Sequence, residues 1–391
     1  MKTAINVQMA DRVKNLPPYL FERIDKLKRE ALGKGVDLID LSIGDPDIPT
    51  PSHIVKALQK ASENPAHHRY PSYEGMFSFR KAVAGWYNRR FQVNIKPENE
   101  ALSLIGSKEG IGHIALAYVN PGDVVLCPSP GYPVYSIGTL FAGGFPYFMP
   151  LRAENDFKPD FSQIPEEIYK RTKLMFLNYP NNPTSAVASR EFFADAIDIA
   201  YKYNIIICHD AAYSEIYYDG EKPLSFMEVD GSKDVGMEFH SLSKTYNMTG
   251  WRIGFAVGNK DILFGLGKIK TNLDSGVFQA IQEAAICALE TEDSVLCNIR
   301  DTYQARRDAL YDGLCSIGLT AYKPQSTFYL WTVVPEGFTS ETFAEYLLNK
   351  AGVMATPGNG FGESAEGYIR FALTVPVERI KEAVQRIRKI I

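Results

Sequence analysis

The stretch MEFHSLSKTYNMTGWRIG, residues 237–254, joins a short apolar run to a polar turn in which Lys244 lies among hydroxyl side chains. Three similar runs precede it, namely DVVLCP (123–128), KLMFLNYP (173–180) and NIIICHD (204–210). Short apolar runs of this kind are typical of buried strands. Amphipathic helical patterns at 52–63, 77–93 and 190–203 alternate with them. The alternation predicts an α/β fold with a mostly parallel sheet that helices cover on both faces.

The pattern changes after about residue 280. Two long helices are expected at 276–290 and 293–317, and short strands and a final amphipathic helix follow. This order is typical of a smaller α+β domain. We therefore predict a large domain over residues 50–280 and a small α+β domain made from residues 1–49 and 281–391.

Composition narrows the class of protein. The chain has 391 residues, 45% of them hydrophobic, and a formal net charge of -4 from 42 basic and 46 acidic residues. The charges are scattered, so no basic face for nucleic acid is expected, and no run is long enough to span a membrane. The N-terminus lacks the apolar core of a signal peptide, and the five cysteines form no C-x-x-C pair. We expect a cytoplasmic protein with buried free thiols.

Lys244 has neighbours that suit a phosphate group. Ser241 and Ser243 offer hydroxyl donors, and Arg252 offers a planar guanidinium that can bind two phosphate oxygens. A second candidate is the turn IGSKEG (105–110), where Ser107 and Lys108 come before a predicted helix whose free N–H groups favour an anion. Neither stretch has the spacing of a Walker loop. A lysine beside a phosphate site suggests a phosphorylated aldehyde held as a Schiff base, for which pyridoxal 5′-phosphate is the common case.

This cofactor makes further demands, and the chain has candidates for each. Asp210 ends a buried-type strand and can pair with the ring nitrogen, while Tyr213 and Asn182 can bind the phenolic oxygen. Tyr132 offers an aromatic face for the ring. Taken singly, Asp210 also fits a helix N-cap, Asn182 a turn before proline, and Tyr132 a core position. The combination of these residue types in one chain favours the cofactor site.

The stretch SLSKTYNMTGWRIG resembles the cofactor-attachment signature of the class I and II aminotransferases. The motifs YPNNPT, DAAYSE and GYIRFAL extend this resemblance over nearly the whole chain. The resemblance implies fold type I, with a seven-stranded, mostly parallel sheet in the large domain. It also implies that Lys244 holds pyridoxal phosphate and moves the substrate's α-proton, with ping-pong kinetics. The residues implied to contact the cofactor are Ser107, Lys108, Tyr132, Asn182, Asp210, Tyr213, Ser241, Ser243 and Arg252.

The same resemblance has implications for assembly and for carboxylate binding. In this family a tyrosine of the partner subunit reaches the phosphate, and Tyr70 in HRYPSYEG is at the matching position before Gly75. The expected active unit is therefore a homodimer. Arg370 in GYIRFAL matches the arginine that binds the substrate's α-carboxylate. Gly44 in LSIGDPD is expected to let the N-terminal segment approach the substrate closely.

Within the family, the resemblance points to LL-2,6-diaminopimelate as amino donor, with 2-oxoglutarate as acceptor and tetrahydrodipicolinate and glutamate as products. The stretches that carry it include LPPYLFERIDKLK, YPSYEGM and TPGNGFG. The residues expected to bind the substrate are Tyr19, Gly44, Lys108, Tyr132, Asn182 and Arg370. Two positions depart from the pattern, with Tyr73 where glutamate is expected and Ser275 where asparagine is expected. The alternatives are an aromatic or alanine aminotransferase, a carbon–sulfur β-lyase, and a transcription regulator with an aminotransferase-like domain.

Overall fold

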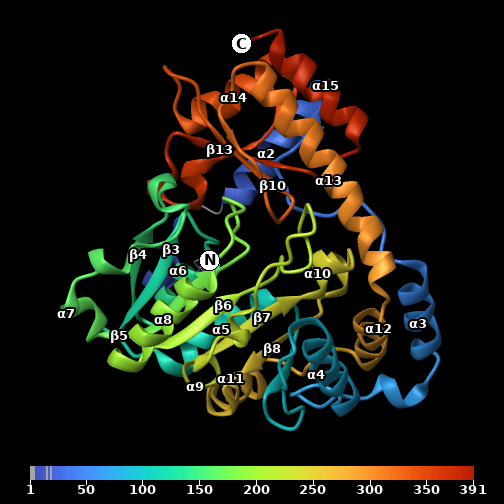
Figure 1. The fold of residues 1–391 in the computed structure, drawn as a ribbon, viewed down its shortest axis with the longest axis vertical. Helices are drawn as coiled ribbons and strands as arrows, with labels where there is room; N and C mark the ends of the chain where they lie inside the picture. The colour runs from blue at the N-terminus through green and yellow to red at the C-terminus, as the bar shows by residue number, and fades with distance from the viewer. Residues whose placement is uncertain (1–4, 15, 18–19) are drawn as a thin grey trace.

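The computed structural model describes residues 5–14, 16–17 and 20–391. A large part is built on a seven-stranded sheet, and Figure 1 shows a smaller part with a four-stranded sheet above it. The predicted α/β fold with a mostly parallel sheet is confirmed. In the part of the chain that the structure describes, no helix combines the length and the apolar character needed to cross a membrane.

The large sheet has the strand order β2-β8-β7-β6-β5-β3-β4. Its strands are β2 (Ala101–Leu104), β3 (Val124–Ser129), β4 (Phe145–Pro150), β5 (Thr172–Asn178), β6 (Ile206–Asp210), β7 (Gly236–Ser241) and β8 (Gly254–Gly258). Only β8 runs against its neighbours, which are β2 and β7. The carboxyl ends of the other strands therefore meet at one edge of the sheet, where ligands bind in folds of this kind.

Helices cover both faces of this sheet, as alternating side chains on its strands require. Val125 and Cys127 point to one face and pack with α5 (Ser107–Tyr118), α6 (Val134–Phe141) and α11 (Lys260–Leu273). Val124 and Leu126 point to the other face, which α4 (Phe77–Phe91) and α8 (Arg190–Tyr203) cover. Because both faces are buried, the strands are continuous apolar runs rather than alternating ones.

The small part combines an antiparallel sheet with several helices. The sheet has the order β12 (Thr356–Pro357), β13 (Tyr368–Ala372), β10 (Tyr329–Val333) and β9 (Ala321–Tyr322). The helices are α2 (Leu20–Gly33), α14 (Ser340–Ala351) and α15 (Val377–Arg388), and α13 (Asp293–Ser316) runs from the large part into the small one (Figure 1). β1 (Ile39–Asp40) pairs in parallel with β11 (Val353–Met354), so these two N-terminal residues lie against the C-terminal part.

The predicted helices are present, with shifts at their ends. The helices predicted at 52–63, 276–290 and 293–317 correspond to α3 (Ser52–Ser62), α12 (Gln279–Leu289) and α13. α8 begins after Ser189, whose hydroxyl accepts from the N–H of Phe192, and it is followed by Asn204 in the left-handed conformation.

The expectation of buried thiols is wrong for three cysteines. Cys127 and Cys208 lie in strands and are buried, whereas Cys287 and Cys297 are half-buried and Cys315 is exposed, because helices present one side to solvent.

Candidate active site

A cavity of about 310 Å³ lies at the carboxyl edge of the large sheet, beside β10 and β13 of the small part. The predicted site residues that line it are Gly44, Ser107, Lys108, Tyr132, Asn182, Asp210, Tyr213, Ser241, Ser243, Lys244, Arg252 and Arg370. Tyr70 does not line the cavity, and its side chain is 86% exposed. Tyr19 lies outside the described residues. Segments from across the whole sequence thus converge on one site.

Lys244 lies on the short helix α10 (Leu242–Thr245), which directly follows β7. Its Nζ donates a hydrogen bond of 2.9 Å to the carbonyl oxygen of Gly44. Burial is the main cause that lowers the pKa of Lys244 to about 8; the charges of Arg252 and Arg370 act in the same direction, and Asp45 opposes them. A lysine in this environment is neutral in a substantial fraction near pH 8, so it can act as a nucleophile and as a base.

Asp210 ends β6 and has one free carboxylate oxygen at the cavity. Its Oδ2 accepts a hydrogen bond of 2.8 Å from the hydroxyl of Tyr135, whereas its buried Oδ1 has no partner in the described part of the chain. Burial raises the pKa of Asp210, and the hydrogen bond from Tyr135 opposes that rise. Because a buried acceptor without a partner is costly, Oδ1 is suited to a donor on a bound ligand.

The first turn of α5 and the segment that follows β7 contribute a group of donors to the cavity. Gly106 precedes α5 with a φ of 71°, and a Cβ added there would lie 2.1 Å from a guanidinium nitrogen of Arg252. Only glycine lets the arginine approach the helix start so closely. The hydroxyl of Ser243 is buried and has no partner within residues 5–14, 16–17 and 20–391. The free N–H groups of α5, the guanidinium and the hydroxyl together suit a phosphate.

Arg370 lies on β13 and is 1% exposed. It donates to Oδ1 of Asn182 at 2.8 Å and to the carbonyl oxygen of Ser42 at 2.7 Å, while its Nε has no partner among the residues that the structure describes. Burial lowers the pKa of Arg370. Within the described ranges it forms no ion pair with a carboxylate. A buried guanidinium that lacks a counter-ion is suited to a carboxylate of a ligand.

Comparisons with known proteins agree with this geometry. Residues 36–387 match the family described as aminotransferase class I and II. The chain belongs to this family. An LL-diaminopimelate aminotransferase of Aquifex aeolicus (strain VF5) is 57% identical over 98% of this chain and 99% of its own length. Substrate-bound BacF from Bacillus subtilis superimposes with a TM-score of 0.94 and 39% identity over 98% of both chains. A probable N-succinyldiaminopimelate aminotransferase from Thermus thermophilus has a TM-score of 0.90 and 37% identity, covering 95% of this chain and 100% of its own.

Several residues that line the cavity of this aminotransferase were not predicted from the sequence, and Tyr135, Asn178 and Tyr329 are among them. Tyr135 donates to Asp210, and Asn178 donates through Nδ2 to the carbonyl oxygen of Asp210 at 2.7 Å. Tyr329, at the start of β10, lies against Arg370 and Tyr213. Tyr135 has a sequence signal, because it follows Tyr132 by nearly one helical turn in GYPVY. Tyr329 has none, since the run TFYLW only predicts a buried strand.

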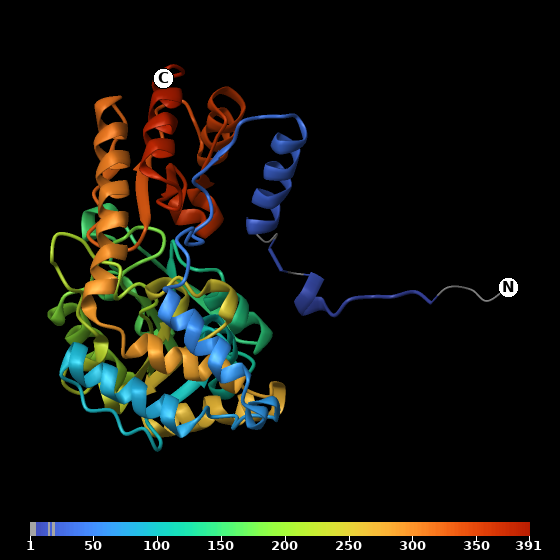
Figure 2. The ribbon, with the colours of Figure 1, turned by 90° about the vertical axis from the view of Figure 1, so that its right-hand side faces the viewer.

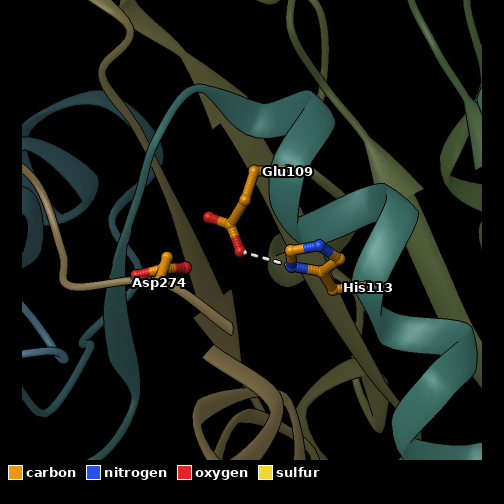
Figure 3. Close-up of side chains that lie close together, drawn as sticks. All are labelled: Glu109, His113 and Asp274. Carbon is orange, nitrogen blue, oxygen red and sulfur yellow. Dashed lines mark hydrogen bonds and ion pairs between the residues drawn. The ribbon is translucent and has the colours of Figure 1, made fainter. Parts of the chain in front are cut away.

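A second polar cluster lies next to the aminotransferase site, on α5 and α11. Figure 3 shows Glu109, His113 and Asp274 close together, with a hydrogen bond of 2.9 Å between Glu109 and Nδ1 of His113. The Nζ of Lys270 lies 2.9 Å from Glu109 Oε2 and 3.0 Å from Asp274 Oδ2. The single ammonium group of Lys270 thus forms an ion pair with each of the two carboxylates. We interpret the cluster as an ion-pair network that fixes the first turn of α5, and not as a metal site.

In the protein without cofactor, we expect the reaction of Lys244 with a small aldehyde to be half-maximal near pH 8. Only the neutral amine is a nucleophile, and the folded protein holds the pKa of Lys244 at about 8. The rate constant should therefore rise as pH increases through 8 and level off above it. Reductive methylation with ¹³C-formaldehyde, followed by mass spectrometry of the peptide that contains Lys244, measures this profile.

The same reaction in denaturant gives the matched reference for Lys244. The unfolded chain removes the burial, so the midpoint is expected to move to about pH 10.4, the usual pKa of a lysine side chain. A folded protein whose Lys244 reacts only above pH 10 would contradict the assigned environment.

Proposed function

We propose that this aminotransferase transfers an amino group from LL-2,6-diaminopimelate to 2-oxoglutarate, giving tetrahydrodipicolinate and glutamate. The observation that carries the proposal is the 57% identity, over nearly the full length of both chains, to a protein named LL-diaminopimelate aminotransferase. Further relatives with the same name are 56% and 54% identical. The buried guanidinium of Arg370 next to the Lys244 amine is consistent with an amino acid substrate.

Pyridoxal 5′-phosphate fits the groups that line the cavity. The unpartnered Oδ1 of Asp210 would accept from the protonated ring nitrogen, and Ser107, Ser241, Ser243 and Arg252 would hold the phosphate, together with Lys108 of α5. Tyr132 would lie against the ring, and Tyr213 and Asn182 would bind the phenolic oxygen. When bound, the cofactor supplies an aldehyde that takes up the amino group and a ring that withdraws electrons from the α-carbon.

The protein's own residues bind the substrate and move one proton. Arg370 holds the α-carboxylate with two parallel N–H groups, and its hydrogen bonds to Asn182 and Ser42 fix the plane of the guanidinium. The Nζ of Lys244, neutral in part because burial lowers its pKa to about 8, takes the α-proton of the amino donor and later returns a proton to the carbon that receives the amino group. The carboxylate of Asp210 would stay ionised because it pairs with the positively charged ring nitrogen, and the two charges would stabilise each other.

The remaining substrate contacts are also part of the proposal. Gly44 lies at the cavity with its carbonyl oxygen against Lys244, so the segment 43–45 would be close to the bound substrate. Lys108 and Tyr132 would face the distal end of diaminopimelate, together with Tyr19 and the loop 70–75.

We also propose the domain division at residues 50 and 281, with the site between the two domains. A cytoplasmic location stays a prediction.

A panel of amino donors tests the proposed substrate. The enzyme loaded with pyridoxal phosphate is mixed with 2-oxoglutarate and one donor, and the glutamate formed is measured. We expect kcat/KM for LL-diaminopimelate to exceed that for alanine, phenylalanine and N-succinyl-LL-diaminopimelate by about 100-fold or more, because alanine and phenylalanine lack a charged distal end and the succinyl derivative lacks the distal ammonium. A higher kcat/KM for alanine or phenylalanine would overturn the substrate assignment. Release of a thiol from cystathionine would instead favour a carbon–sulfur lyase.

We also propose that the active unit is a homodimer. Large side chains are exposed on the surface around the loop 70–77: Tyr70 is 86%, Tyr73 44%, Phe77 51% and Phe278 40% exposed. Residues 5–14 extend away from the body of the molecule (Figure 2), and Ile5 there is 85% exposed. Apolar surface of this kind is typical of a protein interface. A second copy of the chain would cover it, with Tyr70 reaching the partner's phosphate site.

Mixed dimers test the placement of Tyr70. We expect the variants Tyr70→Ala and Lys244→Ala to be impaired alone and to regain activity when mixed under conditions that exchange subunits. Each mixed dimer has one site with both residues intact and one site with neither. Random pairing of equal amounts makes about half of the dimers mixed, so about a quarter of all sites are restored. The rate of glutamate formation before and after exchange measures this. If Tyr70 acted within its own subunit, no site of a mixed dimer would be intact and the mixture would stay impaired.

A further inference from the structure

Tyr329 lies where the two parts of the molecule meet, and nothing in the sequence marked it. It is the first residue of β10, is 3% exposed, and lines the same cavity as Lys244. It touches three other residues of the site. Its hydroxyl lies 3.0 Å from the hydroxyl of Tyr213, its ring lies against Arg370, and a Cβ added to Gly44 would come within 1.9 Å of its hydroxyl oxygen.

The backbone of Tyr329 is held at both of its polar groups. Ser185 donates to its carbonyl oxygen at 2.7 Å, and its N–H donates to Oγ1 of Thr327 at 3.1 Å. The two hydroxyl oxygens of Ser185 and Thr327 lie 2.7 Å apart. Both residues have a positive φ, of 64° and 66°, which is unfavourable for side chains other than glycine and especially for a β-branched one. Strain of this kind is retained where the position of a neighbouring group matters.

The hydroxyl of Tyr329 shares a hydrogen bond with the hydroxyl of Tyr213, and either of the two can be the donor. Burial is the main cause that raises the pKa of Tyr213 well above its usual value, and the neighbouring Tyr329 acts in the same direction. Tyr213 therefore keeps its proton. A hydroxyl has a single proton to donate. When Tyr329 donates to Tyr213, the proton of Tyr213 is available to an acceptor in the cavity, and the chain of two hydrogen bonds strengthens both.

The ring of Tyr329 determines the plane of Arg370. The guanidinium carbon lies 4.1 Å from the centre of the Tyr329 ring and 4.6 Å from the centre of the Phe361 ring. Contact with two aromatic rings stabilises a buried cation and restricts its orientation. One side chain thus contacts both the group proposed to bind the phenolic oxygen and the group proposed to bind the carboxylate.

We propose that Tyr329 is a positioning residue that directs the hydroxyl of Tyr213 toward the cofactor and holds the guanidinium of Arg370 in place for the carboxylate. The inference rests on the proposed function, because it assumes that a cofactor and a carboxylate occupy the cavity. The two parts of the role are separable, since the hydroxyl acts on Tyr213 and the ring acts on Arg370.

The variant Tyr329→Phe tests the first part without substrate. The visible absorbance of the cofactor-loaded enzyme is titrated with pH. Loss of the donor to Tyr213 weakens the hydrogen bond to the phenolic oxygen, so the midpoint is expected to rise by roughly one pH unit. In a Tyr213→Phe background the same change should leave the midpoint where it is. An unchanged midpoint in Tyr329→Phe, or an equal rise in both backgrounds, would overturn this part.

A second pair of variants tests the ring. Tyr329→Leu is expected to raise KM for 2-oxoglutarate roughly tenfold, whereas Tyr329→Phe should change it little, because phenylalanine retains the aromatic face. Phe361→Leu is the matched control: it removes the second ring that contacts Arg370, so it should raise KM without moving the absorbance midpoint. Equal KM values in all variants would overturn the second part. An unaltered protein that shows no visible band with pyridoxal phosphate would instead refute the cofactor proposal itself.

Discussion

Replacing Lys244 by alanine is expected to lower kcat by about 10⁴-fold or more, because one side chain provides both the covalent attachment of the cofactor and the base that moves the α-proton. The Nζ of Lys244 is the amine that the cavity presents beside Gly44, and burial lowers its pKa to about 8. Steady-state kinetics with LL-diaminopimelate and 2-oxoglutarate measure the loss of turnover. The amount of cofactor retained after gel filtration measures the loss of covalent attachment.

A matched control distinguishes this role from a general loss of charge. Lys268→Ala removes an exposed lysine on α11 and should leave kcat unchanged. In Lys244→Ala, a small primary amine added to the solution is expected to restore part of the turnover, because it can enter the space that the side chain leaves and accept the proton. Retention of wild-type turnover by Lys244→Ala would disprove the mechanism.

Replacing Arg370 by lysine is expected to lower kcat/KM about 100-fold for the amino donor and for 2-oxoglutarate alike, since both present an α-carboxylate to the same guanidinium. A lysine retains the charge but has no planar pair of N–H groups, and it cannot donate to both Asn182 and Ser42 in the same geometry. Initial-rate measurements over a range of both substrates give the two values.

The specificity of this effect can be checked with a donor that lacks the α-carboxylate. Such an amine should react slowly with the unaltered enzyme, and its rate should fall little further in Arg370→Lys, because it makes no carboxylate contact with Arg370 that the variant could remove. A loss of equal size for donors with and without the carboxylate would show that Arg370 acts on the fold and not on the substrate. The unfolding midpoint in urea detects such a structural effect.

Much of the site could be predicted from positions in the sequence. Asp210 and Lys244 each follow an apolar strand of the large sheet, and in a parallel sheet the carboxyl ends of strands meet at one edge. Local patterns therefore place them together without knowledge of the tertiary structure. Gly106 and Ser107 have a similar signal, because a glycine before a helix start is typical of an anion site.

Other features have no local signal. Tyr329 belongs to a strand of the small part, and its contacts with Tyr213 and Arg370 depend on how the two parts pack. The carbonyl of Gly44 accepts from Lys244 across 200 positions in the chain. Within the described part of the chain Arg370 has no carboxylate partner, and this depends on every side chain around it. A motif can therefore identify the arginine but cannot show how its charge is paired.

The sequence by itself determined the fold class, the family and the order of the elements, because the alternation of apolar strands and amphipathic helices and the spacing of short motifs are local properties. The tertiary structure alone decided which groups are left without partners in the cavity. Folding buries Asp210 Oδ1, Ser243 Oγ and Arg370 Nε and leaves each of them without a partner among the described residues. Burial and the absence of partners arise from packing between segments far apart in the sequence, and these two properties make the cavity a binding site.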